Sequence, residues 1–222
     1  SFDTDPDLMT AYDDEIELYI DRFQKFVKRI LDMSPDSKLV FIWGNHERRL
    51  LRKLMSDAAQ FRRTIMKSFI KGIQFNGKVW YIGEVDHVRL GPLQVEHGNR
   101  HNEHVAKSRL IDEGGQVSLM FGHVHKQNFF ELRGADYAVR AISTGCLCHP
   151  HPHYAHKGTS SRSGRKWTQG TGVASFSLKG RLVQFENIAF ERVGTRMISY
   201  LRGEKLVVDK DNKAVGLKTQ VA

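Results

Sequence analysis

The chain has 222 residues, of which 40% are hydrophobic and 27% are charged, and its formal net charge is +9. This composition is ordinary for a globular protein with one full core, because a chain of this size buries roughly 70% of its unfolded surface. The longest apolar run, residues 39–43, excludes a membrane span of ~20 residues, and no apolar leader suggests secretion. The only cysteines, Cys146 and Cys148, are too close in sequence for a relaxed disulfide, which predicts a reducing, cytoplasmic setting.

Apolar residues recur at three- and four-residue steps from Leu8 to Leu31, which predicts a long amphipathic helix ending at residues 34–36. Residues 39–43 are apolar without a break and predict a buried strand. Helical spacing resumes over residues 48–69. Short strands are then predicted at residues 79–82, 88–90 and 93–96, with a hairpin turn at Gly91-Pro92 between the last two.

The second half of the chain is predicted to be richer in strands. A helix is expected over residues 103–113 and a buried strand over 117–121, and the pattern is mostly β from Tyr137 onward. A loop rich in His, Gly and Ser interrupts it at residues 146–166. We therefore predict an α/β domain over residues 1–190 and a polar C-terminal extension over residues 191–222.

The charge is unevenly distributed along the chain. Residues 1–36 carry ten acids against four bases, whereas residues 46–75 carry eight bases against two acids. A solvated helix face is the commoner explanation of such a basic run, and a phosphate-bearing partner is the more specific one. Charge alone leaves both interpretations open.

Glycine and polar residues follow three of the predicted strands. The sequences are Gly44-Asn45-His46-Glu47, His97-Gly98 and Gly122-His123-Val124-His125. Each histidine alone is typical of a solvated strand end, and a lone Gly-Asn is typical of a turn. Three such strand ends in one chain favour a metal site instead, because glycine lets the backbone approach an ion closely.

Strand side chains alternate between faces, so we expect His123 and His125 to point the same way and to serve adjacent metal ions. Imidazoles with the amide oxygen of Asn45 suit manganese, zinc, iron or nickel. Two such ions clamp the oxygens of a phosphoryl group. His46 follows Asn45 and projects differently, so it is the candidate to donate a hydrogen bond to a phosphate or a proton to the leaving group.

These three motifs, in this order, resemble the calcineurin-like metallophosphoesterase family, especially its small bacteriophage-type members, over residues 38–190. The resemblance implies two packed mixed β-sheets flanked by helices, with metal ions held on loops at the strand ends. It implies that Asn45, His97 and His123 bind one ion and that His125 binds the other. It makes His46 the imidazole that assists the phosphate.

Two earlier motifs of that family, Asp-x-His and Gly-Asp-x-x-Asp, have no match in this chain. We therefore expect an N-terminally incomplete domain that lacks two strands. Their absence would expose the apolar faces of residues 39–43 and 117–121, which we expect an N-terminal complementing polypeptide or a second copy in a homo-oligomer to cover.

The predicted function is metal-dependent hydrolysis of a phosphomonoester or phosphodiester, with the net charge tilting the substrate toward nucleic acid. The alternative is a non-catalytic phosphate- or nucleic-acid-binding module that has lost the first metal site. Arg48 and Arg49 are candidates for contacting a substrate phosphate, although simple solvent exposure explains them equally well. The loop at residues 146–166 is interpreted as a substrate-contacting or plain exposed loop rather than as a second metal site.

Overall fold

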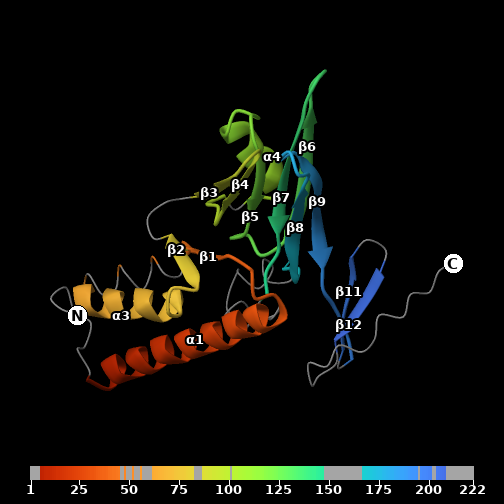
Figure 1. The fold of residues 1–222 in the computed structure, drawn as a ribbon. Helices are drawn as coiled ribbons and strands as arrows, with labels where there is room; N and C mark the ends of the chain where they lie inside the picture. The colour runs from red at the N-terminus through yellow and green to blue at the C-terminus, as the bar shows by residue number, and fades with distance from the viewer. Residues whose placement is uncertain are drawn as a thin grey trace. The chain divides into compact units, whose positions relative to one another are not determined.

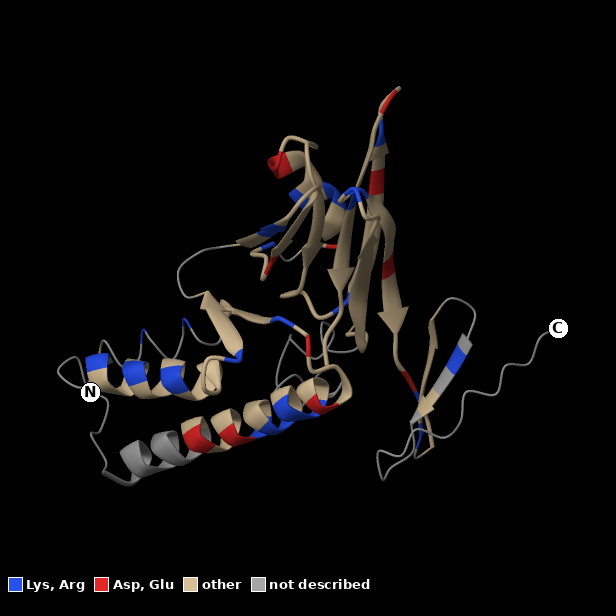
Figure 2. Cartoon of the chain, in the orientation of Figure 1, with Lys and Arg blue, Asp and Glu red and all other residues tan. Residues whose placement is uncertain are grey.

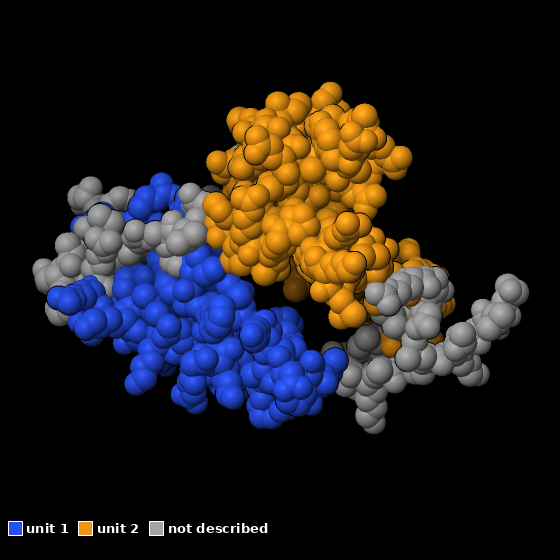
Figure 3. All heavy atoms as spheres, turned by 45° about the horizontal axis from the view of Figure 1, so that its top comes forward, with its two compact units in different colours: residues 1–86 blue, residues 87–222 orange. Residues whose placement is uncertain are grey.

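The computed structural model describes residues 6–45, 48, 52, 56, 62–82, 87–100, 102–147, 167–194, 196–201 and 204–208. The fold is mixed α/β with several sheets (Figure 1). The chain forms two compact units, residues 1–86 and residues 87–222 (Figure 3), and the sequence analysis set no boundary between them. The predicted division at residue 190 stays a prediction.

The first unit packs two helices against a parallel pair of strands. The elements described in full are α1 (Pro6–Met33), β1 (Leu39–Ile42), α3 (Arg62–Gln74) and β2 (Val79–Ile82), with β1 pairing β2. The predicted first helix and both predicted strands are confirmed. In the described part of the chain, no helix has an apolar stretch long enough to cross a lipid bilayer.

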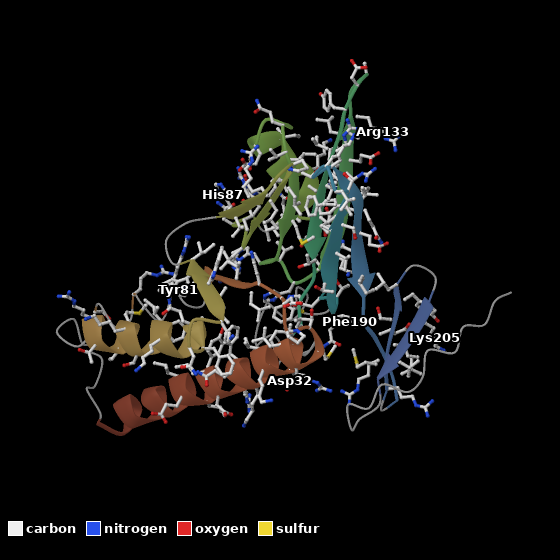
Figure 4. The ribbon with its side chains drawn as sticks, in the orientation of Figure 1. Asp32, Tyr81, His87, Arg133, Phe190 and Lys205 are labelled. Carbon is white, nitrogen blue, oxygen red and sulfur yellow. The ribbon has the colours of Figure 1, made fainter. Side chains whose placement is uncertain are left out.

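Aromatic side chains fill the core of this unit. The ring of Trp43 meets Tyr81 edge-on at 5.7 Å and Phe69 at 6.5 Å between centroids, and Tyr81 projects from β2 (Figure 4). A Cβ atom at Gly72 of α3 would come within 2.8 Å of Ile20 of α1, so glycine is what lets these helices approach so closely. The Gln24 amide also donates to the Gly72 carbonyl oxygen at 2.8 Å.

Two expectations about this unit need correction. Helix α3 continues five residues beyond the predicted end at residue 69, because Ile73 is fully buried in the same core as Phe69. The strand at residues 39–43 is only partly buried: Val40 is 39% exposed, and β2 is the only partner of β1 among the described strands. Most of the predicted helix before residue 62 lies outside the described residues.

The second unit is built on a five-stranded mixed sheet with the order β3-β4-β5-β7-β6. Strands β4, β5 and β7 run parallel to one another, while β3 and β6 are antiparallel to their neighbours. The strands are β3 (His87–Leu90), β4 (Leu93–Glu96), β5 (Ser118–Phe121), β6 (Gln127–Arg133) and β7 (Ala138–Thr144). The predicted hairpin is confirmed, and β6 is a strand that the sequence analysis did not place.

Both faces of this sheet are covered. Helix α4 (Val105–Asp112) packs on one face through Leu110 against Leu119 and its neighbours. An antiparallel pair, β8 (Gly170–Phe176) with β9 (Leu182–Ala189), packs on the other through Phe185 against Leu93 and Ile142. A separate three-stranded sheet follows, formed by β10 (Glu191–Val193), β11 (Arg196–Leu201) and β12 (Glu204–Val208).

The expected exposure of residues 117–121 is wrong. Strand β5 has neighbours on both sides, so its backbone is paired along both edges. Leu119 is 0% exposed and Phe121 is 2% exposed, because α4 covers the face to which they point. The second unit therefore completes its own core around this strand.

A pair of adjacent residues on α4 tests this packing. Replacing the fully buried Leu110 by Ala should lower the free energy of unfolding by about 2–5 kcal/mol, since it removes apolar contacts and leaves a cavity. Ile111→Ala is the matched control, because that side chain is 62% exposed and its loss should cost less than about 0.5 kcal/mol. Urea unfolding followed by circular dichroism measures both, and equal losses would contradict the packing of α4.

Candidate functional site

Three parallel strands of the second unit end at the same edge of the sheet. His97 follows β4, Gly122 and His123 follow β5, and Cys146 lies just beyond β7. The ends are tied together, because the Gly122 amide donates to the His97 carbonyl oxygen at 3.2 Å. The carboxyl edge of a parallel sheet is where ligands commonly bind in α/β proteins.

The rings of His97 and His123 meet at this edge. His97 Nε2 and His123 Nδ1 are 3.0 Å apart, with ring centroids 5.0 Å apart and the planes inclined at 74°. At the 2.0–2.1 Å of a metal–imidazole bond, two nitrogens on one ion lie about 2.8–3.0 Å apart at a right angle and about 3.3–3.4 Å apart at a tetrahedral angle. The observed 3.0 Å matches the first arrangement, and it also matches a hydrogen bond between the two rings whose donor depends on the tautomer. Two adjacent imidazoles are groups that fit a metal.

The expected reason for the orientation of His123 and His125 is wrong. Strand β5 ends at Phe121, and both histidines lie beyond it with left-handed backbone, at φ +68° and φ +57°. Strand alternation therefore does not orient them. Such values are uncommon outside glycine, although histidine is among the residues enriched there. The histidines are presented by a turn in which the Val124 amide donates to the Gly122 carbonyl oxygen at 2.9 Å.

Residues that precede β8 contact His125. Its ring meets the Trp167 ring edge-on at 4.2 Å between centroids, and its carbonyl oxygen accepts from the Thr168 amide at 2.8 Å. Trp167 and Thr168 come directly before β8, far along the chain. The sequence analysis gave Trp167 no role in positioning a histidine.

A buried ion pair anchors the end of β4, directly before His97. Arg109 of α4 donates from Nε to Glu96 Oε1 at 2.8 Å and from Nη2 to Oε2 at 2.9 Å. Burial acts to lower the pKa of Arg109, but hydrogen bonds to Glu96 and Glu113, with their charges, outweigh it and raise that pKa. Both side chains are almost entirely covered. The pair keeps Arg109 charged and fixes the strand end from which His97 projects.

Sequence reasoning missed this pair, although two signals were present. In Leu93-Gln94-Val95-Glu96 the glutamate alternates onto the face that α4 covers. Arg109 lies among the apolar residues of the same helix face, one position before Leu110. A charged residue at an inward position on each of two neighbouring elements indicates a buried ion pair, because neither charge is stable there alone.

The glycines of the site differ in what they contribute. Gly98 has φ +86°, and a Cβ atom there would come within 3.2 Å of the Phe121 ring, so the chain needs glycine to turn after His97. At Gly122 a Cβ atom would meet only the His97 carbonyl oxygen, at an ordinary 3.8 Å. A Cβ atom at Gly122 would therefore fit without a clash with the described residues.

The other predicted residues lie in the first unit or outside the description. Asn45 follows β1 and begins a helical turn in which the Arg48 amide donates to the Gly44 carbonyl oxygen at 3.3 Å, and Arg48 is exposed. His46, Arg49 and residues 148–166 lie outside the described residues. The structure brings His97 and His123 together. Their binding of one ion with Asn45, and the binding of a second ion by His125, stay predictions.

Within the described ranges, no group of three or more His, Cys, Asp or Glu side chains gathers as a metal site. The described residues thus supply an imidazole pair rather than a full set of ligands. Comparisons of the chain with protein-family models, with curated proteins and with solved structures gave no match.

The ion pair behind His97 can be tested by removing one charge. Glu96→Gln should lower the free energy of unfolding by about 1.5–3 kcal/mol, because it removes the charge of the bidentate partner of Arg109 while Glu113 and Asp112 still pair with that guanidinium. Asp21→Asn is the control, since its pair with Lys25 is exposed and worth less than about 1 kcal/mol. Urea unfolding compares the two variants. Similar losses would mean that the Glu96 pair does not anchor the strand.

Proposed function

We propose that this chain is a metal-dependent phosphoesterase of the calcineurin-like type, which hydrolyses phosphate diesters or monoesters. The observation that carries the proposal is the 3.0 Å approach of His97 Nε2 and His123 Nδ1 at the ends of two adjacent parallel strands. A pair of strand-end imidazoles at this spacing suits a divalent ion. The order of the Gly-Asn-His-Glu, His-Gly and Gly-His-x-His motifs along the chain supports the same conclusion.

The roles of the ligands follow from their chemistry. His97 and His123, with the amide oxygen of Asn45, would hold one divalent ion such as manganese, zinc, iron or nickel, and His125 would serve a second. When bound, such ions neutralise phosphate oxygens and lower the pKa of water. The contact of His125 with Trp167 would fix its ring orientation.

His46 is proposed as the residue that handles a proton. Because it follows Asn45 directly, its ring would project differently from the ligand side chain. As an imidazole it can donate a hydrogen bond to a phosphate oxygen or protonate the leaving group. Arg48 and Arg49 would add positive charge for the phosphate at the rim.

The alternative is a phosphate- or nucleic-acid-binding module without catalysis. The observations that favour it are the net charge of +9 and the lack of a match in this sequence to the Asp-x-His and Gly-Asp-x-x-Asp motifs. Salt-dependent nucleic-acid affinity with no hydrolysis in any divalent metal would select this alternative.

We also propose the reducing cytoplasm as the setting. Cys146 and Cys148 are too close in sequence for a relaxed disulfide, and the Cys146 thiol donates to the Thr168 carbonyl oxygen at 3.6 Å. Cys148, two residues on, lies outside the described residues.

Substitution of single histidines tests the division of roles. His123→Ala should lose both bound manganese and hydrolysis of bis(p-nitrophenyl) phosphate, since it removes a ligand. His46→Ala should lower turnover while keeping the metal content, because its imidazole acts on the substrate. The control is His87→Ala on β3, an exposed histidine labelled in Figure 4, which should change neither.

Elemental analysis and an absorbance assay give the two readouts for these variants. We expect at most one tightly bound ion per chain, through Asn45, His97 and His123. Metal retention in His123→Ala would contradict the assignment of the ligand, and an emptied site in His46→Ala would contradict the assignment of the proton donor.

A further inference from the structure

Helix α3 carries a line of evenly spaced positive charges on its outer face. Arg63, Lys67 and Lys71 are spaced four residues apart and all three are exposed. Four residues of α-helix rise about 6 Å, so the three side chains form a stripe about 12 Å long. Figure 2 shows blue along this helix without red, because α3 contains no acidic residue.

The charge of this stripe is not neutralised within the described residues. None of the three side chains forms an ion pair or a side-chain hydrogen bond there. Helix α1 behaves differently, since Lys25 pairs with Asp21 and Lys28 pairs with Asp32, each at 2.7 Å. Surface lysines of α1 are therefore paired with acids, whereas those of α3 have no such pair among the described residues.

Another face of α3 packs into the core of the first unit. Met66, Phe69 and Ile73 pack into the core of the first unit, so the apolar side of the helix has no surface left to offer. The remaining exposed residues of the helix are small or polar: Thr64, Ser68 and Gln74. The outer face thus combines fixed positive charge and hydrogen-bonding groups, and Ile70, which lies on the same side as Arg63, is half-buried.

The polar and positively charged outer face of α3 favours one class of partner over membranes and proteins. A helix that lies in a membrane surface buries an apolar face among the lipids, and a protein interface has an apolar core with aromatic residues. Nucleic-acid interfaces are instead polar and strongly positive, and their phosphates present a regular line of negative charge. A polar helix face with evenly spaced cations matches the last of these.

We propose that the outer face of α3, formed by Arg63, Lys67 and Lys71, binds the phosphodiester backbone of a nucleic acid. Each cation replaces a counterion on a phosphate, and no base is read, so the contact is independent of sequence. The surface works without any divalent metal. Its failure is therefore distinguishable from failure of the proposed hydrolysis.

The test compares two double variants that remove the same charge from one unit. Lys67→Gln/Lys71→Gln removes two cations from the stripe, and Lys25→Gln/Lys28→Gln removes two that are paired on α1. Binding of fluorescein-labelled single-stranded and duplex oligonucleotides is followed by fluorescence anisotropy in EDTA, across a salt series. Circular dichroism verifies that each variant is folded.

We expect the α3 variant to bind more weakly and to lower the slope of log K against log salt by about 1.4–1.8, which corresponds to two lost phosphate contacts. The α1 variant should keep the original slope, and Lys67→Arg/Lys71→Arg should restore it. An equal loss in the α1 variant, or an unchanged slope in the α3 variant, would overturn the proposal. Binding to phosphatidylserine vesicles but not to oligonucleotides would overturn it in favour of a membrane surface.

Discussion

The parallel register of β4, β5 and β7 decides which side chains of the second unit meet. Because these strands are neighbours and run the same way, their carboxyl ends lie at one edge of the sheet. His97 and His123 are 26 positions apart in sequence, yet their ring nitrogens are 3.0 Å apart at that edge. The core beneath, with Leu119 and Phe121 buried under α4, holds the register in place.

Helix α4 covers one face of the sheet and also supplies a partner of the buried ion pair. Its apolar residues seal one face of the sheet, and Arg109 on the same helix face grips Glu96 at the end of β4. A bidentate ion pair with little access to water fixes direction as well as distance, because both hydrogen bonds must stay aligned. The residue next to Glu96 is His97, so the packing that builds the core also limits how the imidazole can move.

The two groups of side chains on which the proposals rest belong to different units. The histidine pair belongs to the second unit, while the evenly spaced cations of α3 belong to the first. A metal site that acts on a phosphate ester requires only the few atoms around the reacting phosphorus. A longer polyanion needs additional contacts along its backbone, and a helix with regularly spaced cations supplies them. The proposed hydrolysis and the proposed binding surface would serve the same class of substrate.

The sequence by itself determined the elements whose patterns are strong and local. The heptad-like spacing of α1, the apolar run of β1, the hairpin at Gly91-Pro92 and the candidate histidines were all readable, because side-chain periodicity reflects which face is buried. It did not place β6, and it attributed the orientation of His123 and His125 to a strand that had already ended. The sequence also did not predict the Glu96–Arg109 pair or the contact between His125 and Trp167. These features depend on which strands become neighbours and on how a turn bends the backbone. Only the tertiary structure decides them, since pairing joins residues that no local pattern connects.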